Sequence, residues 1–121
     1  MKFIDFRLLK KSFLNAKNGL IYSFCHEQNF RLGSIIGLIV IFFTFYFPLS
    51  IGQRVTILLL VALFLILELL NSVLERTIDL FKPRIDPAAG IIKQMMSGIL
   101  LVVVIFSIII GLIIFLPYFI K

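Results

Sequence analysis

The sequence has few of the charged residues that soluble proteins place in water, and acidic residues are especially scarce. Only 15% of its 121 residues are charged, with 6 Asp and Glu against 12 Lys and Arg, whereas 61% are hydrophobic. About a quarter of the residues are charged in an average globular domain. The apolar excess excludes a disordered chain and argues against a soluble fold. We therefore expect one integral-membrane domain over residues 1–121.

The chain also lacks the residues of several common functional sites. A single cysteine, Cys25, excludes an internal disulfide, and a single histidine, His26, excludes paired Cys or His metal ligands. There is no glycine-rich phosphate-binding loop and no Ser or Cys triad. Charges interrupt the N-terminal segment, so we expect no cleaved signal peptide. A basic arm for nucleic acid is disfavoured, because the basic residues form no compact run.

Three segments are long and apolar enough to cross a bilayer, which requires roughly 20 mainly apolar residues. We predict spans at about 32–51, 55–81 and 87–117. Pro48 and Gly52 mark the turn after the first span. Asp86 is the expected N-cap of the third span, and Pro117 is expected to loosen its end.

Residues from about 3 to 27 carry too many charges to span. Their apolar residues nevertheless recur at steps of three and four along one stripe: Phe6, Leu9, Phe13, Ala16, Leu20 and Phe24. This pattern indicates an amphipathic helix lying on the membrane surface. The predicted fold is therefore an all-α membrane protein with an N-terminal amphipathic surface helix and three transmembrane helices.

The basic residues are distributed unequally between the two ends of the spans. Ten of the twelve lie before the first span, near the end of the second (Arg76), between the second and third spans, or just inside the third, and only Arg54 and Lys121 lie on the other side. Lys and Arg near span ends favour the cytoplasmic side. We therefore expect a cytoplasmic N-terminus and an external C-terminus.

Five polar residues share one arc of the second span: Glu68, Asn71, Ser72, Glu75 and Asp79. An acid at mid-span costs roughly 2.5–3.5 kcal/mol, so this arc must face protein or water. It could serve only to bind neighbouring helices. Glu68, however, lies about 10 Å deeper than Glu75 at 1.5 Å per residue, and we interpret it as a functional carboxylate. Asp79 is equally consistent with an interfacial structural role.

Two further charges are candidates for the cytoplasmic end. Glu27 projects from the apolar side of the surface helix, where it either pairs with Arg31 or meets Glu75. Two carboxylates brought together would require a cation, and Mg²⁺ suits a few oxygen ligands completed by phosphates. Lys93 is either a snorkelling interfacial lysine or a positive charge for a phosphate.

These residues resemble a known family. The second span contains the run ELLNSVLE at residues 68–75, followed by Asp79, which resembles the signature of the prokaryotic diacylglycerol kinase family, including the undecaprenol kinases. Glu27 upstream and Lys93 downstream match as well, and the resemblance covers nearly the whole chain. Residues 111–117 look more like the undecaprenol kinase branch.

The resemblance implies an ATP-dependent lipid kinase in a bacterial plasma membrane, built as a homotrimer with sites shared between subunits at the cytoplasmic face. Glu68 would be the general base on the lipid hydroxyl, supported by Asn71, and Glu27 and Glu75 would hold Mg²⁺. The implied ATP-binding residues are Lys93, Gln94, Asn15 and Asp86, and the implied lipid-binding residues are Asn29 and Ser97. Undecaprenol is slightly preferred over diacylglycerol as the substrate, and no nucleic acid is expected.

One departure from the family pattern leaves an alternative open. Gln94 stands where the family usually has an aspartate, and Met96 is bulkier than the usual small residue. The chain could therefore be a catalytically silent membrane subunit of the same fold. An ion or proton pathway along the Glu68 face is a further alternative, which the charges on the cytoplasmic side disfavour.

Overall fold

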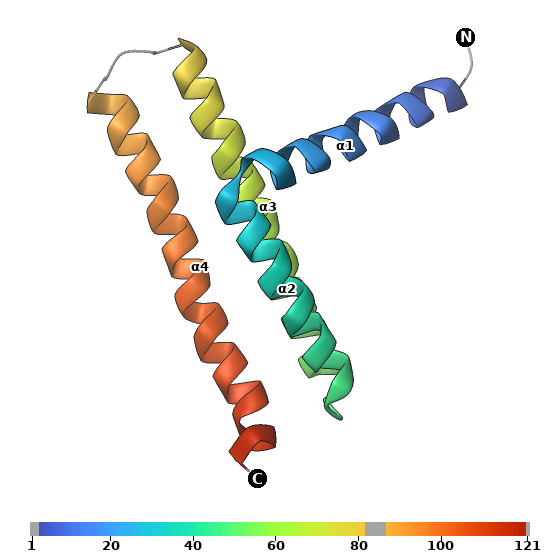
Figure 1. Ribbon diagram of the computed structural model, residues 1–121, viewed down its shortest axis with the longest axis vertical. Coiled ribbons are helices and arrows are strands. Elements are labelled where there is room, and N and C mark those ends of the chain that lie inside the picture. The colour runs from blue at the N-terminus through green and yellow to red at the C-terminus, as the bar shows by residue number, and fades with distance from the viewer. Residues whose placement is uncertain (1–2, 82–86, 121) are drawn as a thin grey trace.

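The computed structural model describes residues 3–81 and 87–120. Within them the elements are α1 (Phe6–His26), α2 (Gln28–Tyr46), α3 (Ile51–Phe81) and α4 (Pro87–Ile120), and this part of the chain contains no strand. Helix α3 packs against both α2 and α4, while α1 projects sideways from the point where it joins α2 (Figure 1). The predicted all-α class is confirmed, with one N-terminal helix and three long apolar helices.

Helices α2, α3 and α4 are each long and apolar enough to cross a bilayer. Their large side chains are mostly exposed, as for Leu38 at 68%, Leu59 at 65% and Ile113 at 69%. A helix is the form in which such apolar sequences satisfy every backbone hydrogen bond within lipid. Contiguous apolar surface of this extent is rare on soluble monomers, so the outside of the bundle suits hydrocarbon.

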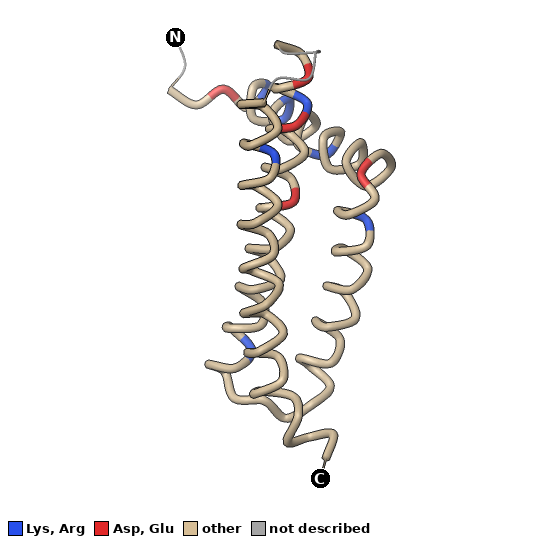
Figure 2. Tube along the Cα trace, turned by 90° about the vertical axis from the view of Figure 1, so that its left-hand side faces the viewer, with Lys and Arg blue, Asp and Glu red and all other residues tan. Residues whose placement is uncertain are grey.

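Charged residues gather at one end of this bundle. Figure 2 shows acidic and basic residues concentrated where α1 joins the other helices, with few charges toward the opposite end. The three apolar helices therefore separate a charged end from an apolar end. This distribution suits a protein whose polar chemistry takes place at one membrane surface.

The turn between the first two spans comes earlier than predicted. It comprises residues 47–50, so Gly52 lies inside α3. The reason is a reciprocal capping arrangement: the backbone N–H of Gln53 donates to Ser50 Oγ, and the backbone N–H of Ser50 donates to Gln53 Oε1. This pair satisfies two otherwise unpaired donors at the start of α3 and lets the helix begin at Ile51.

Arg54 closes the same turn from the other side. Its Nε donates to the carbonyl oxygen of Thr44 at 3.2 Å, and its Nη2 donates to the carbonyl oxygen of Phe47 at 3.3 Å. These carbonyls lie at the C-terminal end of α2, where no later helical N–H reaches them. Apolar packing completes this end of the bundle through Leu49, Ile57 and Ile114, with Val40, Phe47, Val61, Ile110, Phe115 and Tyr118 around them.

Two other helix boundaries differ from the predicted ones. Helix α2 starts at Gln28 instead of about residue 32, because Arg31 is too polar for an apolar window but fits easily into a helix. Helix α4 starts at Pro87 as expected but continues through Pro117 to Ile120. A proline so near a helix end removes only one backbone donor. Asp86, the expected N-cap, lies outside the described residues.

Candidate active site

The deep end of the polar arc on α3 is buried. Glu68, Asn71 and Ser72 are 5%, 8% and 8% exposed, whereas Glu75 is half-buried and Asp79 is exposed. Their spacing of three and four residues keeps them on one helical face, as predicted. Ser72 donates its hydroxyl to the carbonyl oxygen of Glu68 at 3.1 Å. The residues of the arc are therefore buried near Glu68 and become more exposed toward the charged end of the bundle.

Asn71 has a buried oxygen that the protein leaves unpaired. Its Oδ1 forms no hydrogen bond within the described part of the chain. Buried polar atoms are almost always hydrogen-bonded, so an unpaired acceptor beside a buried carboxylate indicates a place for a polar ligand.

Glu68 lines a largely apolar groove between α2, α3 and α4. The groove has a volume of about 590 Å³, and its polar residues are Glu68, Asn29 and Ser107. Asn29 comes from the first turn of α2 and Ser107 from the middle of α4. An apolar cavity with a few convergent polar groups is the usual form of a small-molecule site. This groove suits a molecule with a long apolar chain and a hydroxyl that reaches the carboxylate.

Glu27 forms the junction between α1 and α2. It is the C-cap of α1 and the N-cap of α2, with an extended backbone. Its Oε1 accepts two hydrogen bonds from Arg76 of α3, from Nε at 3.1 Å and from Nη2 at 2.6 Å. Arg31 approaches Glu27 only through the backbone, its N–H donating to the Glu27 carbonyl oxygen. Arg76 thus takes the place of Arg31 as the ionic partner of Glu27.

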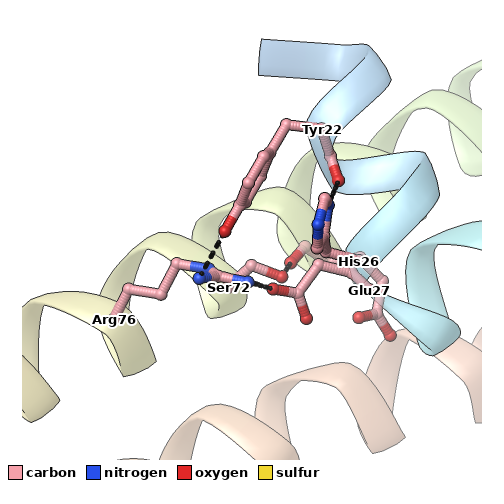
Figure 3. A network of polar contacts seen from close by, with 6 residues as sticks. Tyr22, His26, Glu27, Ser72 and Arg76 are labelled. Carbon is pink, nitrogen blue, oxygen red and sulfur yellow. Dashed lines mark hydrogen bonds and ion pairs between the residues drawn. The ribbon is translucent and has the colours of Figure 1, made fainter.

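Arg76 is held by Tyr22 as well as by Glu27. Its Nη1 donates to the Tyr22 hydroxyl at 3.0 Å, and its guanidinium carbon lies 4.9 Å from the centre of the Tyr22 ring. The His26 ring stacks on Tyr22 with centroids 4.1 Å apart, and its Nδ1 bonds the Tyr22 carbonyl oxygen (Figure 3). These four residues, Tyr22, His26, Glu27 and Arg76, join α1 to α3.

Sequence reasoning missed the roles of Tyr22 and Arg76. Arg76 was interpreted only as one of the cytoplasmic charges. Arg76 follows Glu68 by eight residues, which places it about 80° from Glu68 around the helix. This position at the edge of the polar arc could have indicated that Arg76 belongs to the site. The sequence offered no comparable indication for Tyr22, because its contact with Arg76 depends on how α1 and α3 are arranged in space.

Lys93 of α4 pairs with Asp79 of α3. The distance from Nζ to Oδ1 is 2.9 Å, and the two side chains are 37% and 64% exposed. Exposed ion pairs of this kind contribute only about 0.2–1 kcal/mol to stability, so the lysine can exchange its partner at little cost. Asp79 therefore has a structural contact, and Lys93 stands on the α3 side of α4 near the acids.

The structure does not gather every residue that the resemblance implies. Asn29 lies in the groove with Glu68. Asn15, Gln94 and Ser97 are exposed, and their side chains form no hydrogen bond in the described part of the protein. Asn15 lies halfway along α1, the helix that projects sideways from the others (Figure 1). Asp86 lies outside the described residues, so its ATP-binding role stays a prediction.

Glu27 and Glu75 fit a cation that arrives with a phosphate better than they fit a permanently bound metal ion. Residues 3–81 and 87–120 contain no group of three or more His, Cys, Asp or Glu side chains that could hold a metal alone. Mg²⁺ in nucleotide sites, however, needs only one or two carboxylates, since phosphates and water supply the other oxygens. Glu75 forms no hydrogen bond or ion pair with the described residues, and no hydrogen bond from them ends on Oε2 of Glu27, so both carboxylates can provide such ligands.

Two comparisons with known proteins match most of the chain. The family model for prokaryotic diacylglycerol kinase matches residues 14–115, a stretch that runs from α1 into the last turns of α4. An undecaprenol kinase from Bacillus subtilis (strain 168) is 36% identical over 107 residues, which cover 88% of this chain and 87% of the relative. Both matches include all the acids of the polar arc. The chain therefore belongs to the prokaryotic diacylglycerol kinase family.

Proposed function

We propose that this protein is a membrane lipid kinase that transfers the γ-phosphate of ATP to the hydroxyl of undecaprenol. The observation that carries the proposal is the burial of Glu68 in the wall of an apolar groove. The family membership supports lipid phosphorylation, and the similarity to an undecaprenol kinase favours a polyprenol over diacylglycerol.

In the proposed reaction Glu68 is the general base. It accepts the proton of the lipid hydroxyl as the hydroxyl oxygen bonds to the γ-phosphorus and the bond to the leaving ADP breaks. Asn71 offers its unpaired Oδ1 to orient the hydroxyl. Asn29 and Ser97 are the proposed contacts to the lipid. Positioning and charge neutralisation supply most of the catalysis in phosphoryl transfer.

The charged end of the bundle is the proposed nucleotide site. Glu27 and Glu75 would hold Mg²⁺, which neutralises phosphate charge when it is bound with ATP. Lys93 would exchange Asp79 for a phosphate oxygen. Asn15, Gln94 and Asp86 are the remaining proposed ATP-binding residues.

We further propose that the protein acts as a homotrimer with a cytoplasmic N-terminus. Asn15, Gln94 and Ser97 are exposed and do not line the groove that contains Glu68, so a neighbouring subunit could bring such residues to the site. The gathering of basic residues at the α1 end supports a cytoplasmic position for that end, with α1 on the membrane surface and the C-terminus outside (Figure 2).

The test is a lipid-specificity assay on purified trimeric protein in detergent with MgATP. We expect phosphate transfer to undecaprenol and slower transfer to diacylglycerol. Transfer to diacylglycerol alone would overturn the polyprenol assignment. Nucleotide binding without transfer to either lipid, unchanged by Gln94→Asp, would overturn the kinase proposal and support a catalytically silent subunit.

A further inference from the structure

The two hydrogen bonds between Arg76 and Glu27 end on the same oxygen. Nε and Nη2 both donate to Oε1, at 3.1 Å and 2.6 Å. Oε2 forms no hydrogen bond with any residue that the structure describes. The guanidinium therefore occupies one oxygen of the carboxylate completely and leaves the other available.

Arg76 is itself fixed in this orientation. Tyr22 accepts a hydrogen bond from Nη1 at 3.0 Å, and its ring centre lies 4.9 Å from the guanidinium carbon. Each of the three guanidinium nitrogens therefore donates a hydrogen bond to Glu27 or Tyr22. The His26 ring stacks on the Tyr22 ring and contributes to holding it in place (Figure 3). A guanidinium is a planar, rigid group, so contacts on two sides determine how it presents its nitrogens.

Stability alone does not explain this arrangement. The Arg76 and Glu27 side chains are 50% and 23% exposed, and ion pairs that water reaches to this extent contribute little to folding. Glu27 also lies at the junction of α1 and α2, where its backbone is extended. The backbone of a regular helix therefore does not fix the direction of its side chain. Arg76 supplies the side-chain contact that orients it.

We propose that Arg76 is a positioning residue, which holds Oε1 of Glu27 and presents Oε2 to the divalent cation that accompanies the nucleotide. This inference rests on the proposed function. Carboxylates that bind metal ions are commonly hydrogen-bonded by outer residues, whose loss weakens metal binding. The opposite role, in which Arg76 blocks Glu27 and must leave before the cation binds, predicts the reverse effect of its removal.

The test measures cation binding directly in the full-length protein in detergent. Mn²⁺ is the probe, titrated by electron paramagnetic resonance in the presence of the non-hydrolysable β,γ-imido analogue of ATP. We expect Arg76→Gln to weaken Mn²⁺ binding by about tenfold, the lower end of the effect of losing an outer-shell partner. Arg76→Lys, which keeps the charge, should restore part of the affinity, and Tyr22→Phe should have a smaller effect.

A matched control removes the same charge elsewhere on the protein. Arg7 is exposed in the first turn of α1, and its backbone N–H bonds Asp5. Arg7→Gln should bind Mn²⁺ as the unaltered protein does. In kinase assays, Arg76→Gln should raise the Mg²⁺ concentration needed for half-maximal rate while keeping most of kcat at saturating Mg²⁺.

Unchanged or tighter Mn²⁺ binding by Arg76→Gln would overturn the inference, as would a fall in kcat that Mg²⁺ does not restore. Arg76→Lys keeps the test decisive if Arg76→Gln does not fold. Failure of the proposed function would look different: the unaltered protein would phosphorylate no lipid, while the binding titration would still decide the role of Arg76.

Discussion

Lys93 of α4 forms an ion pair with Asp79 of α3, with Nζ 2.9 Å from Oδ1. The lysine proposed to bind a phosphate of ATP therefore already has an anionic partner within the chain. In the proposed site, Asp79 would compete with the nucleotide phosphate for this ammonium. The ion pair between Lys93 and Asp79 is weak, because both side chains are partly exposed, so Asp79 would reduce the affinity for the phosphate only slightly.

Replacing Asp79 should for this reason improve nucleotide binding. We expect Asp79→Asn to lower the KM for ATP by about 1.4- to fivefold, the range that corresponds to an exposed ion pair. Initial rates measured against ATP concentration check this. Asp5→Asn, at the start of α1, removes an equal charge and should leave the KM unchanged. A higher KM for Asp79→Asn would show instead that Asp79 orients Lys93.

The contact between α2 and α3 depends on Gly33. A Cβ at this position would lie 2.5 Å from Cε2 of Phe64, too close without movement of the ring. We expect Gly33→Ala to reduce the stability by about 1–3 kcal/mol, as overpacking commonly does. The thermal unfolding midpoint in detergent measures the change.

Gly19 provides the control for this substitution. It lies in α1, and a Cβ there would have no atom within 4 Å beyond its own helix and chain neighbours. Gly19→Ala should leave the midpoint unchanged or raise it slightly, because alanine favours helix. Equal effects of the two substitutions would show that the close approach of α2 to α3 contributes nothing.

Cys25 allows the orientation to be measured. It is the single cysteine of the sequence, and it is exposed near the end of α1. We expect a membrane-impermeant maleimide to label it in inverted membrane vesicles and not in intact spheroplasts, because this end should be cytoplasmic.

A second variant reports the opposite end of the bundle. Gly52→Cys, combined with Cys25→Ala, places the thiol in the exposed first turn of α3. This thiol should be labelled in spheroplasts. Labelling of the two variants on the reverse sides would contradict the predicted orientation.

The sequence predicts the helices and the deep carboxylate well because charge is costly in lipid. Uncharged runs of more than 20 residues identified two of the three long helices. The second span combined a shorter uncharged run with the arc around Glu68, which correctly indicated a face turned into the protein. Where charges are rare, their positions carry structural information.

The partners of those charges were not predictable in the same way. Glu27 and Arg76 lie 49 positions apart, and their contact depends on how α1 meets α3. Local spacing made Arg31 one of two expected neighbours of the Glu27 side chain, but the extended backbone at Glu27 removes the helical geometry that such a pair needs. The early turn before α3 likewise depends on the reciprocal bonds of Ser50 and Gln53.

Glu68 is the residue on which the proposed chemistry depends. Glu68→Gln keeps the shape of the buried side chain but cannot accept a proton, so turnover should fall at least about a hundredfold while nucleotide binding and assembly are retained. Thr77→Val is the control, because Thr77 is exposed on the same helix and bonds the carbonyl oxygen of Val73 one turn before it. It should retain full activity.

The decisive measurement is the rate of γ-phosphate transfer from ATP to undecaprenol by the unaltered protein and by Glu68→Gln, both purified as the same oligomer. We expect phosphorylated lipid from the unaltered protein and about a hundredfold less from the variant. Equal rates from the two proteins would contradict the role of Glu68 as the base.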